Sequence, residues 1–142
     1  MSGLARVLTL GAVCLVAAPG WACAGGSEPS AHALALGYFA QDIEDATRFD
    51  GRRPGVRIDL VDLNGDGCAD AIIVFRSAFL GGARGCSTHV LDMSFDPPRE
   101  AGGMLTCGVV PAATLTNGWR DLRGDDGGRW AYRGDKYEWS RR

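Results

Sequence analysis

The residues whose spacing implies definite chemistry lie in one short stretch, residues 62–70, with the sequence DLNGDGCAD. Alternate positions there offer oxygen atoms, four from side chains and one from a backbone carbonyl: Asp62, Asn64, Asp66, Asp70 and, through its carbonyl, Cys68. Ca²⁺ prefers roughly six to eight oxygen ligands, and alternate side chains of a tight loop can converge on one centre. Gly67 permits the left-handed turn that wraps such a loop around an ion. We therefore expect a Ca²⁺ site formed by these five residues.

The position of each ligand defines the type of loop. Counted from Asp62, the five residues occupy positions one, three, five, seven and nine, which calcium loops of the EF-hand type also use. An EF-hand adds a bidentate Glu at position twelve, but that position is Ile73 here, inside an apolar run. We therefore expect a structural ion site of modest affinity in a β-hairpin over residues 56–76. The alternative is a metal-free turn, because Asp, Asn and Gly are also common turn residues.

The Asp-x-Asn-x-Asp-Gly-x-x-Asp pattern of residues 62–70 resembles the loops between strands of FG-GAP and VCBS-like repeats, as in integrin propellers. A single copy excludes a complete propeller. The order of residues 62–70, 81–86 and 117–122 also resembles a group of small exported bacterial proteins with one such loop. In that group two cysteines often flank the glycine-rich turn, whereas here Cys86 stands alone. The resemblance implies a fold and an export route, and no activity.

The first residues have the pattern of a secretory signal peptide. Met1 to Arg6 is a short basic start, residues 7–18 are mostly apolar, and small residues stand at Ala22 and Ala24. We expect residues 1–24 to be removed after Ala24, which predicts a periplasmic or secreted protein. The apolar run is shorter than the roughly 20 residues of a membrane anchor. Lipidation of Cys23 is the less favoured alternative, because Trp21 departs from a lipoprotein signal.

Removal of residues 1–24 leaves three cysteines, Cys68, Cys86 and Cys107. An oxidising compartment permits a disulfide, and one pair with one thiol left over is the simplest count. We expect Cys86 to pair with Cys107, because both lie on neighbouring predicted strands. A Cys68–Cys86 bridge is the rival pairing. No Cys-x-x-Cys spacing supports a cysteine metal cluster.

Periodicity predicts one small α+β domain over residues 25–142, a single helix packed on an antiparallel β-meander. Leu36, Phe39, Ile43 and Ala46 form one stripe of a helix over about residues 31–47. From Val56 onward apolar residues recur at every second position, as in a half-buried strand. The apolar run 71–75 is typical of a central strand covered on both faces. Further strands are predicted at 88–93, 104–110, 119–123, 130–132 and 136–139, and Pro111 is expected to end the strand over 104–110. Turns are predicted at Asn117-Gly118 and at residues 133–135.

Composition and spacing argue against several functions. The net charge of −2 gives no support for nucleic-acid binding. Cys86, His89 and Asp92 could be a thiol nucleophile, its base and a group that orients the base. However, Cys86 and His89 lie on opposite faces of a strand. We therefore expect a noncatalytic, monomeric exported module that binds an unknown envelope or extracellular partner through its aromatic C-terminal quarter. The alternatives are a periplasmic inhibitor or immunity protein of a cell-wall hydrolase and, less favoured, a metal-dependent hydrolase.

Overall fold

The computed structural model of the protein describes residues 26–141, so the predicted signal peptide lies outside the described residues. The described chain has an α+β fold, as expected, with helices and antiparallel strands. The helices are α1 (Glu28–Tyr38), α2 (Ala40–Asp50) and α3 (Ala78–Gly81), followed by a 3₁₀ turn at Gly82–Arg84. The strands are β1 (Gly55–Val61), β2 (Asp70–Arg76), β3 (Cys86–Asp92), β4 (Arg99–Met104), β5 (Val109–Thr116), β6 (Trp119–Gly124), β7 (Arg129–Arg133) and β8 (Lys136–Trp139).

The helical segment is divided in two, where one helix was predicted. Ser27 caps α1 by accepting from the N–H of Ser30, and Pro29 stands in the first turn, where a missing N–H costs nothing. Phe39 separates α1 from α2 with φ −100° and ψ 19°, outside helical geometry. The ring of Phe39 still points into the core, so the predicted apolar stripe continues across the break.

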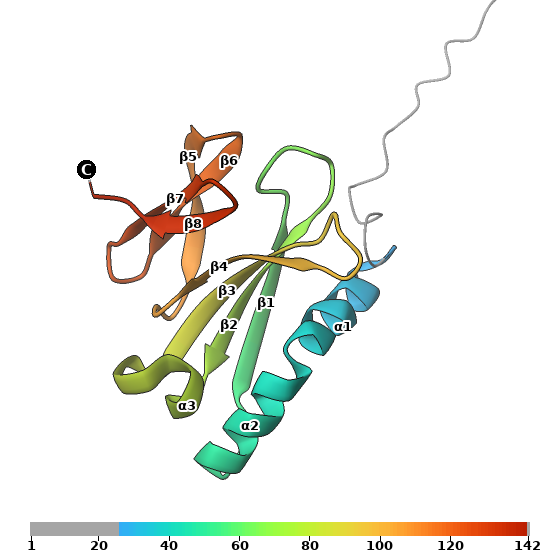
Figure 1. Ribbon diagram of the computed structural model, residues 1–142, viewed down its shortest axis with the longest axis vertical. Coiled ribbons are helices and arrows are strands. Elements are labelled where there is room, and N and C mark those ends of the chain that lie inside the picture. The colour runs from blue at the N-terminus through green and yellow to red at the C-terminus, as the bar shows by residue number, and fades with distance from the viewer. Residues whose placement is uncertain (1–25, 142) are drawn as a thin grey trace, which may run out of the picture.

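The strands form two sheets, where one meander was predicted. Strands β1 to β4 make one four-stranded antiparallel sheet, and β5 to β8 make a second, each in chain order. Figure 1 shows α1 and α2 on one side of the first sheet and the second sheet on its other side. The predicted strand over 104–110 is wrong, because β4 ends at Met104 and β5 begins at Val109. Pro111 does not end β5, because β5 is an outer strand and its register shifts between Pro111 and Leu115.

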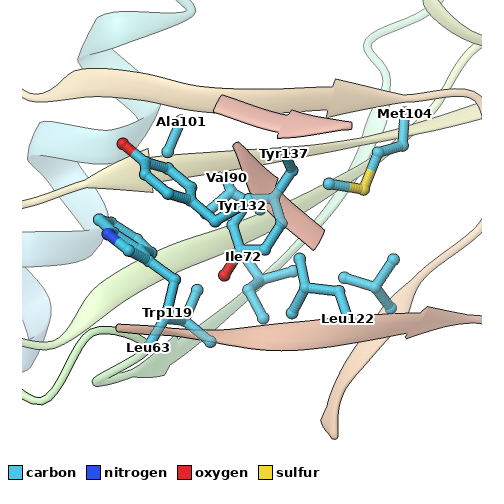
Figure 2. Packing of buried hydrophobic residues seen from close by; sticks show 10 residues of the cluster. Leu63, Ile72, Val90, Ala101, Met104, Trp119, Leu122, Tyr132 and Tyr137 are labelled. Atoms are coloured by element: carbon cyan, nitrogen blue, oxygen red, sulfur yellow. The ribbon is translucent and has the colours of Figure 1, made fainter. Parts of the chain in front are cut away.

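Strand β2 has the central place that its apolar sequence predicts. It pairs with β1 on one side and β3 on the other, and all its residues but Arg76 are buried. Ile73 and Phe75 face the helices and pack with Phe39, Ile43 and neighbouring residues. Ile72 faces the second sheet, where Figure 2 shows it among side chains that include Trp119, Tyr132, Tyr137 and Leu122. Trp119 and Tyr132 stack there with ring centroids 4.4 Å apart.

Close backbone approach and one disulfide join the two sheets. A Cβ atom at Gly102 in β4 would lie 2.9 Å from the Cβ of Tyr137 in β8, so glycine allows the sheets to meet there. The connector 105–108 between the sheets is held by the Cys86–Cys107 disulfide and by Thr88, whose hydroxyl donates to the carbonyl of Thr106 at 2.8 Å. The second sheet is therefore fixed to the first at both β3 and β4.

At Gly81, in the turn from α3 to β3, the backbone of Cys86 leaves no room for a side chain. A Cβ there would lie 2.0 Å from the backbone nitrogen of Cys86, a contact that requires the backbone to move. We expect Gly81→Ala to lower the free energy of unfolding by roughly 3 kcal/mol or more, measured by urea denaturation. Gly37→Ala is the matched control, because a Cβ at this exposed helical position meets nothing within 4 Å. Similar stabilities for the two variants would contradict this account of the turn.

Candidate functional site

The acidic loop connects β1 to β2, so the predicted hairpin is confirmed. Val61 and Asp70 form the last pair of the β1–β2 ladder, and the intervening residues project beyond it. Leu63 fixes the loop to the rest of the molecule: its side chain is buried in the core between the sheets. Its carbonyl also accepts from the N–H of Arg120 in β6 at 2.7 Å. The loop is therefore held against the second sheet at its second position.

The polar side chains at loop positions one, three and five fold over the loop backbone. The carboxylate of Asp62 accepts from the N–H of Gly65 at 2.7 Å and of Gly67 at 3.0 Å. Asp66 accepts from the N–H of Cys68 at 2.7 Å and from the Asn64 amide at 3.1 Å. Gly67 has φ +85°, the left-handed conformation that the sequence predicts for it. The three side chains are thus gathered on one partly exposed turn.

Asp70, at loop position nine, has a different environment. Its side chain is fully buried, and its two oxygens accept from the N–H of Leu63 at 2.9 Å and of Met93 at 3.4 Å. Burial raises the pKa of Asp70 from 3.8 to about 7, which outweighs the opposing effect of the hydrogen bond from Leu63. Asp70 therefore braces the loop from inside, between the start of β2 and the end of β3.

The described residues contain no group of three or more His, Cys, Asp or Glu side chains arranged to hold a metal ion. The loop nevertheless offers two partly exposed carboxylates, an amide oxygen and the carbonyl of Cys68, and carboxylate oxygens can accept more than one contact. A cation there would replace the contact between the Asn64 amide and Asp66, because an N–H group cannot face a cation. In chemical terms, the loop suits a hard cation held mainly by exposed oxygens.

The structure pairs Cys86 with Cys107, as expected, with a Cα–Cα distance of 5.2 Å. Cys68 is disulfide-bonded as well. The rival Cys68–Cys86 bridge is wrong, because the sulfur of Cys86 is bonded to Cys107. Cys86 is also excluded as the nucleophile of a cysteine hydrolase, because its sulfur is already bonded.

Sequence reasoning missed a polar pair on the helical side of the first sheet. His89 of β3 lies 2.7 Å, Nδ1 to Oε1, from Glu100 of β4, which is eleven positions further along the chain. This resembles the base and orienting carboxylate of a hydrolase. The nearby hydroxyl of Ser87 is buried and has no hydrogen-bond partner in the described chain, so it is not placed to attack a substrate. Ser87 therefore offers this pair no nucleophile.

The aromatic C-terminal quarter is mostly interior. Trp119, Tyr132 and Tyr137 are buried between the sheets, and Tyr137 donates its hydroxyl to the carbonyl of Arg120 at 2.8 Å. Trp139 is the exposed member of the group, 57% accessible, with Arg141 stacked 5.3 Å from its ring. The surface expected to bind a partner is thus reduced to the area around Trp139.

A buried carboxylate stabilises the second sheet. Asp121 of β6 accepts from Thr114 at 2.6 Å, from Thr116 at 2.7 Å and from Arg129 at 2.6 Å. Burial would raise the pKa of Asp121, but these hydrogen bonds outweigh it and hold the pKa below its usual value of 3.8. The acceptors of Asp121 are already occupied, so this group is structural.

No family model matches this chain, and neither a curated protein nor a solved structure does. Between residues 26 and 141, none of the helices has the length and apolar character required to cross a bilayer. The function therefore has to be argued from the loop and the surfaces themselves.

The raised pKa of Asp70 predicts a pH-dependent stability. A folded-state pKa of about 7 against 3.8 means that folding takes up a proton between these values, so stability falls as pH rises toward 7. Asp70→Asn removes this titration. In metal-free buffer, the unfolding free energy of the wild type relative to that of Asp70→Asn should fall by roughly 2–4 kcal/mol from pH 4.5 to pH 8. A constant difference across that range, measured by urea denaturation, would show that Asp70 keeps an ordinary pKa.

Proposed function

We propose that the protein is an exported, noncatalytic binding module whose β1–β2 loop holds a structural Ca²⁺ ion. The observation that carries the proposal is that Asp62, Asn64 and Asp66 are gathered on one turn. Leu63 and Asp70 hold this turn in place from its buried side. Asp62, Asn64, Asp66 and the carbonyl of Cys68 would hold the ion. Asp70, the remaining residue of the expected ligand set, lies on the buried side of the turn and would hold the turn in position.

A cation would have a clear physical effect at this loop. Asp62 and Asp66 place two carboxylates on a single turn, and their repulsion opposes the closed conformation unless a positive charge lies between them. Because Leu63 lies in the same turn and packs against the second sheet, closing the loop also favours the contact between the sheets. The ion would therefore stabilise the fold. Ile73 stands at the position where an EF-hand has its bidentate glutamate, so a structural role is proposed in place of a signalling one.

Export and partner binding rest on other features. The N-terminal pattern supports export, and the Cys86–Cys107 disulfide is compatible with an oxidising compartment. The hydroxyl of Ser87 is buried, so the His89–Glu100 pair has no serine nucleophile there, which favours a binding module over a hydrolase. Exposed Trp139 offers an aromatic contact for an envelope or extracellular partner.

Calcium titration of the purified, oxidised protein tests the ion site. Extracellular calcium modules bind with Kd values of about 10⁻⁴–10⁻³ M, so 10 mM Ca²⁺ should raise the unfolding free energy by roughly 1.4–2.7 kcal/mol. The double variant Asp62→Asn/Asp66→Asn should lose this gain, because asparagine keeps an acceptor oxygen for the turn but removes the charge.

Asp135→Asn/Glu138→Gln is the matched control, since it removes two exposed carboxylates in the β7–β8 hairpin. We expect it to keep the full calcium response. If neither the wild type nor this control responds to Ca²⁺ in thermal denaturation or isothermal titration, the loop is a metal-free turn and the ion site is refuted.

A further inference from the structure

A hollow of about 350 Å³ opens between the helical layer and strands β2, β3 and β4. Its aromatic walls are Tyr38, Phe39 and Phe75, and its polar groups are Asp42, His89 and Glu100. These residues come from the α1–α2 junction and from the helix-facing side of the first sheet. The hollow is thus separate from the acidic loop at the β1–β2 turn.

Two features of the backbone create this space. The interruption at Phe39 directs the ring of Phe39 inward, at 4% exposure, and leaves Tyr38 at the rim, at 41%. On the sheet, Gly103 of β4 stands opposite His89 in the register and has no side chain to fill the space. A Cβ at Gly103 would lie 3.4 Å from both the Glu100 oxygen and the His89 nitrogen that form the polar pair. The glycine therefore leaves room for that pair.

The polar groups of the hollow act mainly as hydrogen-bond acceptors. Glu100 uses one oxygen in its contact with Nδ1 of His89, so its second oxygen stays available as an acceptor. The side chain of Asp42 makes no hydrogen bond or ion pair within residues 26–141. No lysine or arginine is among the residues that line the hollow. Two carboxylates therefore face this space, and His89 is the one basic side chain among the residues that line it.

The walls complement these acceptors with aromatic surface. Phe39 lies 5.3 Å from Phe75 and 4.9 Å from His89, centroid to centroid, in tilted or edge arrangements. Aromatic faces attract cations through their quadrupole, and a carboxylate strengthens this attraction. An anion would be repelled by Asp42 and Glu100, and a purely apolar molecule would cover their oxygens without offering a donor, which is costly.

We propose that this hollow binds an organic cation, a guanidinium or alkylammonium group carried on a short apolar stem. The stem packs against Phe39 and Phe75, and the N–H donors face Glu100 and Asp42. The volume of about 350 Å³ lies at the low end of the range of about 300–1,000 Å³ for ligand pockets, which suits a small head group with a few carbon atoms. The chemistry is shared by a free small cation and by a basic side chain of a partner protein, which the probes below distinguish.

Butylguanidinium and its uncharged isostere butylurea are the test pair. Amide NMR spectra of the oxidised full protein, in buffer with EDTA, should show saturable shifts at residues 38–42, 89 and 100–103 with butylguanidinium. Butylurea should bind roughly tenfold more weakly or not at all. Because the buffer contains no free calcium, this result does not depend on whether the acidic loop holds an ion.

Matched variants locate the charge that matters. Glu100→Gln keeps the shape of the side chain and should weaken butylguanidinium binding roughly tenfold. Asp42→Asn, at a residue without contacts of its own, should weaken it severalfold. Glu138→Gln removes an equivalent charge from exposed β8 and should leave the affinity unchanged. All three spectra should retain the dispersion of the folded wild type.

Equal binding of butylguanidinium and butylurea would overturn the proposal. So would an affinity for Glu100→Gln and Asp42→Asn that matches Glu138→Gln in folded protein. A capped tripeptide with a central arginine identifies the source: tighter binding than butylguanidinium indicates a basic side chain of a partner, and weaker binding indicates a free cation.

Discussion

The burial of strand β2 on both faces is the constraint on which the rest of the structure depends. A strand with the sequence AIIVF has no face that can be left in water, so the sheet that contains it requires a cover on each side. Helices α1 and α2 cover Ile73 and Phe75, and the second sheet covers Ile72. The chain before β1 and the chain after β4 thus serve the same purpose on opposite sides.

The two polar sites lie at the margins of these covers. The acidic loop is held where the second sheet meets the β1–β2 turn, because Leu63 belongs both to the loop and to the core between the sheets. The hollow around His89 lies where the helical cover is interrupted at Phe39. In both places a buried apolar residue fixes the backbone and the neighbouring polar side chains are left partly accessible, which is how a rigid fold can present acceptors to a ligand.

The sequence predicted the features that depend on near neighbours. The period of two before Asp62, the apolar run 71–75 and the Asn117-Gly118 turn each contain their own signal, and the structure has the strands and turn they indicate. The division into two sheets carries no such signal, because it depends on the approach of Gly102 to Tyr137, far apart in the chain.

The polar sites divide in the same way. The acidic loop is a single continuous pattern, so its residues and its place in a hairpin could be read directly. The His89–Glu100 pair depends on the register of β3 against β4, including the irregularity between Val90 and Leu91, and neither residue is distinctive alone. Pro111 misled the prediction because a proline ends a central strand but is tolerated on an outer one.

The bridge between Cys86 and Cys107 encloses the whole β3–β4 hairpin, whose turn at residues 94–97 is exposed and includes Phe95. Exposed turns of this kind are the usual places where proteases nick a folded chain. A single cut there would open the backbone without releasing a fragment, because the residues on either side would remain covalently joined through sulfur. The two pieces of a chain cut at this turn therefore stay one molecule as long as the surroundings keep the disulfide oxidised.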